Sequence, residues 1–296
     1  MDDRRASYTA RGAALLRAGH LVLDRPPRIF EDTLAARLCG TEDEAELRAR
    51  LERTVAEIAR LTSAEFAPIA LRHLMASVIL RGRYIEDQLE QTLASGVSQY
   101  VILGAGLDSF AYRRTDLAHA LRVFEVDHPT TQEWKRGRFR ELGVAIPGNL
   151  VYVPINFEEQ STLEVLRSAG YRADAPALFS WLGVVTYLRR EAIFRVLRTI
   201  ASLAVGTRII FSYSLSPELL GVEARRVQDF IMQLTAVRGE PLISFFDPAL
   251  LVQEVRALGF SEVWNFGPEE AHRRYYAQRS DGLRPPDYVQ LMGACV

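Results

Sequence analysis

From Gly96 onward, short runs of β-branched and aromatic residues alternate with amphipathic stretches of helical length. Parallel strands need a crossover helix between them, so this alternation is typical of a mostly parallel sheet with helices on both faces. The predicted fold class is therefore α/β. Five strands are expected in the first part of this region, near residues 100–103, 122–126, 151–155, 177–181 and 208–213.

The C-terminal part of the chain predicts one further helix and two late strands. Asp247 and Pro248 suit the start of a helix, and Gly259 suits the residue after its end, so a helix is expected over about 248–258. The apolar stretches 263–266 and 288–296 are joined by a polar segment. We expect them to form an antiparallel hairpin that completes the sheet edge.

Residues from about 42 to 95 are dense in Leu, Ala, Glu and Arg, with apolar residues three and four positions apart. This spacing predicts amphipathic helices. No internal repeat or low-complexity linker is visible, so we predict one domain over residues 1–296. Residues 1–96 would form a helical cover and substrate lid, and residues 97–296 an α/β core that binds the cofactor.

Composition excludes several classes of protein. The 296 residues are 48% hydrophobic, and the net charge is −1, which is too low for a dedicated nucleic-acid binder. The two cysteines and five histidines show no ligand spacing, so no metal site is expected. We see no signal peptide and no apolar stretch long enough to span a membrane, and we expect a cytoplasmic protein.

The most informative segment is a buried strand that runs from Tyr100 straight into Gly104 and Gly106, with a helix beyond. Glycines at such a turn let the backbone approach a ligand closely. Asp127 follows about twenty residues later at the end of the next strand, where a carboxylate can accept hydrogen bonds from both ribose hydroxyls. The segment predicts a nucleoside-containing cofactor.

Two residues after the turn favour one cofactor over another. Ser109 stands where the dinucleotide fingerprint has its third glycine, and Asp108 puts a negative charge near the helix N-terminus that a pyrophosphate would occupy. A positively charged sulfonium tolerates that carboxylate. S-adenosylmethionine is therefore favoured over NAD, although Asp108 could simply be a helix cap.

Several strings together resemble the leucine carboxyl methyltransferase family, especially its bacterial branch of small-molecule O-methyltransferases. They are LGAGLDSFAYR (103–113), VFEVDHP (123–129), WLGVVTYL (181–188) and RSDGLRP (279–285), and the similarity extends to residues 9–32. The resemblance implies a Rossmann-like class I methyltransferase fold. That fold has a seven-stranded, mostly parallel sheet with an antiparallel last strand.

The resemblance also implies cofactor contacts. Arg17 and Arg81 match the family positions that hold the methionyl carboxylate, and a register error could exchange Arg81 for Arg83. Gly104 would face the amino-acid portion and Asp127 the ribose. Asn156 and Phe157, after the third predicted strand, would contact the adenine.

Two positions depart from the family pattern. Asn156 replaces a usual acid, but its amide oxygen can still accept from the adenine amino group. Leu182 replaces a common glutamate and cannot accept a hydrogen bond. That loss puts in doubt either the cofactor affinity or the usual reaction outcome.

Methyl transfer from a sulfonium is an in-line displacement that depends mainly on positioning, so we designate no catalytic residue. Beside Asp127, His128 is a candidate base by position only. Tyr187, Tyr213 and Arg273 are candidates for lining the acceptor pocket.

The expected reaction is O-methylation of a small natural-product-like acid or phenol, as in secondary-metabolite biosynthesis. Leu182 motivates an alternative with the same cofactor, namely C-methylation or chemistry without methyl transfer. An NAD-dependent oxidoreductase and a non-catalytic protein that binds a partner remain further alternatives. The oligomeric state is not predicted.

Overall fold

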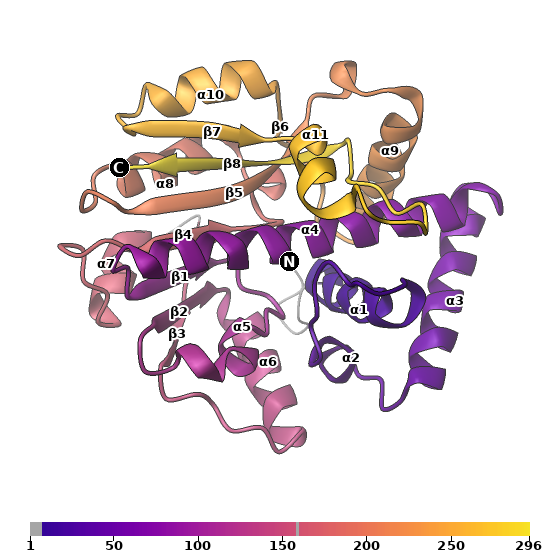
Figure 1. Cartoon of the computed structure of the whole chain (residues 1–296), viewed down its shortest axis with the longest axis horizontal. Helices are drawn as coiled ribbons and strands as arrows, with labels where there is room; N and C mark the ends of the chain where they lie inside the picture. Colours follow the sequence, from indigo (N-terminus) through magenta and orange to yellow (C-terminus); the bar gives the residue numbers. More distant parts are fainter. Residues whose placement is uncertain (1–7, 158–159) are drawn as a thin grey trace.

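The computed structural model describes residues 8–157 and 160–296, and a single sheet runs through its centre (Figure 1). Eight strands of this described part pair in the order β3-β2-β1-β4-β5-β8-β7, with β6 joined to β5 outside that path. Strand β8 is antiparallel to β5 and β7, whereas the other pairs are parallel. The strands are β1 (Gln99–Leu103), β2 (Arg122–Asp127), β3 (Leu150–Pro154), β4 (Leu178–Trp181), β5 (Arg208–Leu215), β6 (Phe245–Phe246), β7 (Glu262–Phe266) and β8 (Val289–Cys295).

This architecture confirms the α/β class, the mostly parallel sheet and the antiparallel last strand. The predicted seven strands form the main path of the sheet, and the short strand β6 adds an eighth, paired with β5 at Ser214↔Phe245 and Leu215↔Phe246. A two-residue strand is too short to show alternation in a sequence. The chain order reverses between β1 and β4, and in open α/β sheets this switch point creates a crevice at the carboxyl ends of the strands.

Helices cover both faces of the sheet (Figure 1). One apolar core lies beneath α7 (Thr162–Ser168), α8 (Arg190–Ala201) and α10 (Pro248–Arg256). The opposite core lies beneath the second half of α4 (Phe66–Ala94), α5 (Phe110–Arg113) and α6 (Pro129–Glu141). The central strands β1, β4 and β5 are buried on both faces, which explains their mainly apolar sequence.

Helix α4 links the sheet to the helical cover. Its residues Ala70 and Leu71 pack with α3 and α9, whereas Ile79 and Leu89 pack against the sheet. Figure 1 shows α1, α2 and α3 gathered beyond one end of the sheet, beside this helix. The remaining α-helices are α1 (Tyr8–Leu23), α2 (Ala35–Leu38), α3 (Glu44–Leu61), α9 (Val222–Val237) and α11 (Pro268–Ala271), of which α11 contributes Ala271 to the second core.

None of the helices in the described part of the chain is by itself long and apolar enough to cross a membrane. Helices α3 and α4 meet the length and composition criteria only as a pair, and that pair is bent by 119°.

A buried ion pair joins α6 to β2. Lys135, the only lysine of the sequence, places Nζ 2.5 Å from Glu125 Oε2, and the two side chains are 1% and 0% exposed. Gln132 lies one turn earlier on α6 and donates from Nε2 to the carbonyl oxygens of Glu125 (2.8 Å) and Val153 (3.0 Å). The buried face of α6 is therefore polar where it meets the ends of β2 and β3.

The close approach of β8 to Trp264 gives a first prediction. A Cβ on Gly293 would lie 2.1 Å from the Trp264 ring, whose Nε1 donates to the Tyr84 hydroxyl at 2.9 Å. Gly293→Ala should therefore lower the free energy of unfolding by about 1–3 kcal/mol, measured by urea denaturation. Gly137→Ala is the matched control: a Cβ on this helical glycine would meet no atom within 4 Å, so the substitution should stabilise by about 0.5–1 kcal/mol. Equal changes in the free energy of unfolding of the two variants would contradict the steric explanation.

The buried ion pair gives a second prediction. Lys135→Met alone should lower the free energy of unfolding by about 3–5 kcal/mol, because Glu125 is left buried without its counter-ion. The double variant Glu125→Gln/Lys135→Met should recover most of that loss, since no buried charge remains. A double variant as unstable as the single one would contradict this account.

The same pair predicts a pH dependence. Burial raises the pKa of Glu125 to about 7, although Lys135 lowers it. Between about pH 4.5 and pH 7 the folded state then binds more protons than the unfolded state, so this carboxyl removes stability as the pH rises. Relative to the double variant, the wild type should lose stability across that window and change little above it. Urea denaturation at several pH values measures the difference, and a rise instead of a fall would contradict it.

Candidate functional site

The glycine turn lies at the carboxyl end of β1, next to the switch point of the sheet. Gly104 adopts the left-handed conformation with φ of +68°, and its N–H donates to the Val126 carbonyl at 2.7 Å. A Cβ at this position would lie 2.4 Å from Val184 Cγ2. Both the backbone conformation and the close packing therefore require glycine here.

Asp127 connects the end of β2 to this turn. Its Oδ2 accepts from the Gly106 N–H, and its Oδ1 accepts from the His128 N–H at 2.6 Å. Burial raises the pKa of Asp127, and these two N–H groups act in the opposite direction. The structure thus places Gly104, Gly106 and Asp127 together, as the sequence motif predicts.

Two neighbouring polar residues make local hydrogen bonds. Asp108 Oδ1 accepts from the Phe110 N–H at 2.7 Å, a local bond to the first residue of α5, whose N-cap position is Ser109. His128 precedes α6, and its Nδ1 accepts from the Thr130 N–H at 3.4 Å. This contact is a local hydrogen bond at a helix start.

Arg17 ties α1 to the residues after the glycine turn. Its Nε lies 2.7 Å from Asp32 Oδ2, and its Nη2 donates to the Leu107 carbonyl at 2.5 Å. Burial acts to raise the pKa of Asp32, but Arg17 and Arg113 hold it below its ordinary value. Ala10 also lies against Gly106, at 3.2 Å from a Cβ placed there, so α1 covers the turn.

Arg81, on α4, lies against the loop after β4. A Cβ on Gly183 would lie 2.5 Å from the Arg81 guanidinium. Burial lowers the pKa of Arg81, Tyr288 and Tyr187 act in the opposite direction, and the charge of Arg17 lowers it further. In the described part of the chain, no carboxylate lies within ion-pair distance of Arg81.

Arg83 differs from Arg81 in its surroundings. Its side chain is 46% exposed, and its Nε lies 2.8 Å from Asp87 Oδ1 on the next turn of α4. Of the two arginines that the sequence left interchangeable, only Arg81 faces the loop after β4.

Tyr187 and Tyr288 complete the surroundings of Arg81. Burial raises the pKa of Tyr187 to about 12, Arg81 lowers it, and the hydroxyl also bonds to Thr9. Burial likewise raises the pKa of Tyr288, whose hydroxyl bonds to Ser77. Both phenols therefore keep their protons near neutral pH and can donate hydrogen bonds.

The predicted adenine residues follow β3, one strand beyond β2. The Asn156 N–H donates to Gln160 Oε1 at 2.9 Å, and Phe157 is partly buried against the core of the sheet. Leu182 directly follows β4 and packs on the opposite core. These residues lie after the carboxyl ends of their strands, and their roles stay predictions.

Two predicted acceptor residues lie elsewhere. Tyr213 is fully buried, and its hydroxyl donates to Asn265 Oδ1 at 2.6 Å and to Gln290 Oε1 at 3.2 Å. The Arg273 side chain is 74% exposed, and its Nε donates to Glu270 Oε2 at 2.9 Å. The Tyr213 hydroxyl is thus bound within the sheet and Arg273 lies on a solvated helix face, and their role at the acceptor pocket stays a prediction.

Sequence reasoning missed three residues of this region. Ala10, Val184 and Tyr288 come from α1, from the loop after β4 and from the segment before β8. Val184 lies in the string 181–188 and Ala10 in the segment 9–32, but small apolar side chains and a lone tyrosine give no sign of which residues they contact. Only the packing of distant segments could identify them.

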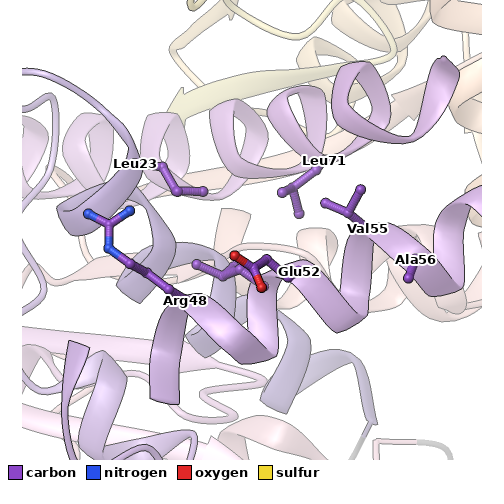
Figure 2. Close-up of a pocket in the computed structure, with 7 residues that line it drawn as sticks. Leu23, Arg48, Glu52, Val55, Ala56 and Leu71 are labelled. Carbon is purple, nitrogen blue, oxygen red and sulfur yellow. The ribbon is translucent and has the colours of Figure 1, made fainter. Parts of the chain in front are cut away.

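A cavity of about 310 Å³ opens in the helical cover (Figure 2). Its lining is mainly apolar and comes from α1, α3 and α4: Leu23, Arg48, Leu51, Glu52, Val55, Ala56 and Leu71. In Figure 2, Leu23 and Leu71 lie on the side opposite α3, which carries Glu52 and Val55. Arg48 already donates to Glu44 and to the Val22 carbonyl, both at 2.8 Å. None of the glycine-turn residues lines this cavity.

Comparison with known proteins assigns the chain to a family. The family model for leucine carboxyl methyltransferase matches residues 10–201. YktD from Bacillus subtilis is 28% identical over 99% of this chain and 99% of its own length, and it is named as an S-adenosyl-L-methionine-dependent methyltransferase. SCO7813 from Streptomyces coelicolor carries the same description and is 29% identical over 68% of this chain and 66% of its own length.

Solved structures share the fold at low sequence identity. A DUF574 family protein from Streptomyces avermitilis aligns with a TM-score of 0.62 at 16% identity, covering 99% of this chain and 98% of that one. A methyltransferase from Thermobifida fusca aligns with a TM-score of 0.55 at 18% identity, covering 88% and 92%. Together with the family match and the glycine turn, the relatives show that this chain belongs to the leucine carboxyl methyltransferase family and is an S-adenosyl-L-methionine-dependent methyltransferase.

Proposed function

We propose that this methyltransferase transfers the methyl group to an oxygen atom of a small natural-product-like acid or phenol. One observation carries the placement of the reaction: Arg17 is bound beside the glycine turn, Arg81 lies against the loop after β4, and the charge of Arg17 acts on Arg81. Two guanidinium groups whose charges repel each other favour an anion in their neighbourhood. The methionyl carboxylate of the cofactor is the anion that we assign there.

The residues around the turn fit the rest of the cofactor. Each oxygen of Asp127 accepts one backbone N–H and keeps a lone pair that a ribose hydroxyl can use. Asn156 and Phe157 follow β3, where the adenine would lie. When bound, S-adenosylmethionine supplies a methyl group on a positively charged sulfur, which is already activated for displacement.

The protein then has to place the acceptor and exclude water. Helix α1 covers the glycine turn through Ala10 and Arg17, and Tyr187 presents a protonated hydroxyl next to Arg81. A carboxylate acceptor needs no base, whereas a phenol must lose a proton. We propose that residues 1–96 act as the substrate lid of a single domain over residues 1–296.

Incubation with methyl-labelled S-adenosylmethionine and panels of small carboxylic acids and phenols tests the reaction. We expect label in the product, released by mild base from a carboxyl ester and resistant to base in an aryl ether. Label that resists both base and ether cleavage would show C-methylation, the alternative motivated by Leu182. Substrate turnover without labelled product would contradict methyl transfer.

The assignment of Arg81 predicts a selective loss of affinity. Arg81→Met should weaken the binding of S-adenosylhomocysteine by about 1.5–3 kcal/mol, because a charged hydrogen bond to the carboxylate is lost. Binding of 5′-methylthioadenosine, which lacks the amino-acid portion, should change little. Calorimetric titration measures both ligands.

Arg83→Met provides the matched control, since Arg83 pairs with Asp87 on the exposed side of α4. It should bind both ligands as the wild type does. Equal losses in the two variants, or equal losses for the two ligands in Arg81→Met, would place the carboxylate elsewhere.

A further inference from the structure

The buried pair of Lys135 and Glu125 is the most unusual charged group outside the contacts assigned to the cofactor. Lys135 is the only lysine of the sequence, and its side chain is only 1% exposed. Glu125 Oε1 is also buried and has no hydrogen-bond partner in the described part of the chain. Burying such a pair is costly, and replacing it by apolar residues is often neutral or stabilising. Its position therefore calls for a role other than stability.

The backbone brings this pair next to Asp127. Residues two apart on a strand point to the same face, so Glu125 and Asp127 share a face with Cα atoms about 6.6 Å apart. Helix α6 begins two residues after Asp127 and turns its buried face back onto β2, where Lys135 Nζ meets Glu125 Oε2 at 2.5 Å. Gln132, on the same face of α6, donates hydrogen bonds to the carbonyl oxygens of Glu125 and Val153.

The Lys135 ammonium acts on the Asp127 carboxylate. Burial raises the pKa of Asp127, the two backbone N–H groups oppose that effect, and the charge of Lys135 opposes it further. A carboxylate must be ionised to accept hydrogen bonds from both ribose hydroxyls with its full strength. The ammonium group thus favours the ionised form of Asp127, which accepts hydrogen bonds from the ribose hydroxyls most strongly.

We propose that Lys135 is a positioning residue for cofactor binding: held by Glu125, its ammonium group keeps Asp127 charged where the ribose binds. This inference rests on the proposed role of Asp127 as the ribose acceptor. Glu125 is the counter-ion that holds the ammonium group at the end of β2. Neither residue of the pair touches the cofactor in this role.

Other charged and titratable groups face the same place. Asp108, from the loop after β1, acts on Glu125, and His128 acts on Asp127 from the start of α6. Tyr112 on α5 and Tyr152 on β3 join their hydroxyls at 2.6 Å beside Glu125, and Arg136 lies 5.5 Å from the Tyr152 ring. Burial keeps both tyrosines neutral by raising their pKa values. Lys135 is therefore the cation that α6 turns inward toward the carboxylates.

The test uses the full-length protein and S-adenosylhomocysteine as the probe, titrated calorimetrically at about pH 6 and about pH 8.5. The variant Glu125→Gln/Lys135→Met removes both charges, and urea denaturation first verifies that it is folded. Relative to the wild type it should bind several-fold more weakly, about fivefold, at pH 6, because a larger fraction of Asp127 is then protonated. At pH 8.5 the loss should fall to about twofold or less, because Asp127 is then ionised in both proteins.

Arg136→Met is the matched control, because it removes an exposed cation of α6 next to Lys135 that lies over the Tyr152 ring and does not act on Asp127. It should bind as the wild type does at both pH values. A folded double variant with no loss, or with an equal loss at both pH values, would overturn the proposal and leave the pair a purely structural role.

Asp127→Ala separates this inference from the proposed function. It should weaken binding by at least about tenfold at both pH values, since the ribose acceptor itself is gone. If Asp127→Ala binds normally, the ribose lies elsewhere and the proposed site fails. If Asp127→Ala binds weakly while the double variant binds normally, only the role of Lys135 fails.

Discussion

The carboxylate of Asp127 is the interaction on which the site depends. It accepts the N–H of Gly106 from the turn after β1 and the N–H of His128 at the start of α6. One side chain at the end of β2 thus connects the turn after β1 with the start of α6. Because Gly104 and Gly106 both have positive φ, no other residue type would hold this turn without strain. A ligand approaching the turn meets backbone and a carboxylate in fixed positions.

The helical cover extends this arrangement across the crevice. Arg17 bonds both Asp32 and the Leu107 carbonyl, so α1 is anchored to the segment after the turn. Arg81 comes from α4, whose second half packs on the sheet, and it reaches the loop after β4 at Gly183. The cover is therefore in contact with both segments, because α1 brings Arg17 to the residues after the turn and α4 brings Arg81 to the loop after β4. The cavity in Figure 2 lies within the same cover but among apolar side chains.

Much of the fold could be predicted because local chemistry specifies it. Asp247 caps α10 by accepting from the Ala249 N–H at 2.8 Å, as the Asp-Pro pair indicated, and the helix ends at Arg256, two residues before the expected end. The five early strands lie within two residues of their predicted bounds at each end. The two-residue strand β6 was missed, because it is defined by its partner β5 and by no pattern of its own.

The sequence by itself determined the strand, the glycine turn and the acid that follows, since turn conformations and strand periodicity act over a few residues. It also carried the motifs that identify the family. Only the tertiary structure decided which arginine of α4 faces the loop after β4, and that the Tyr213 hydroxyl is bound inside the sheet by Asn265 and Gln290. It likewise decided that the one lysine lies buried beside Glu125. The partners of a side chain depend on which distant segments meet, and that is settled by the packing of the whole chain.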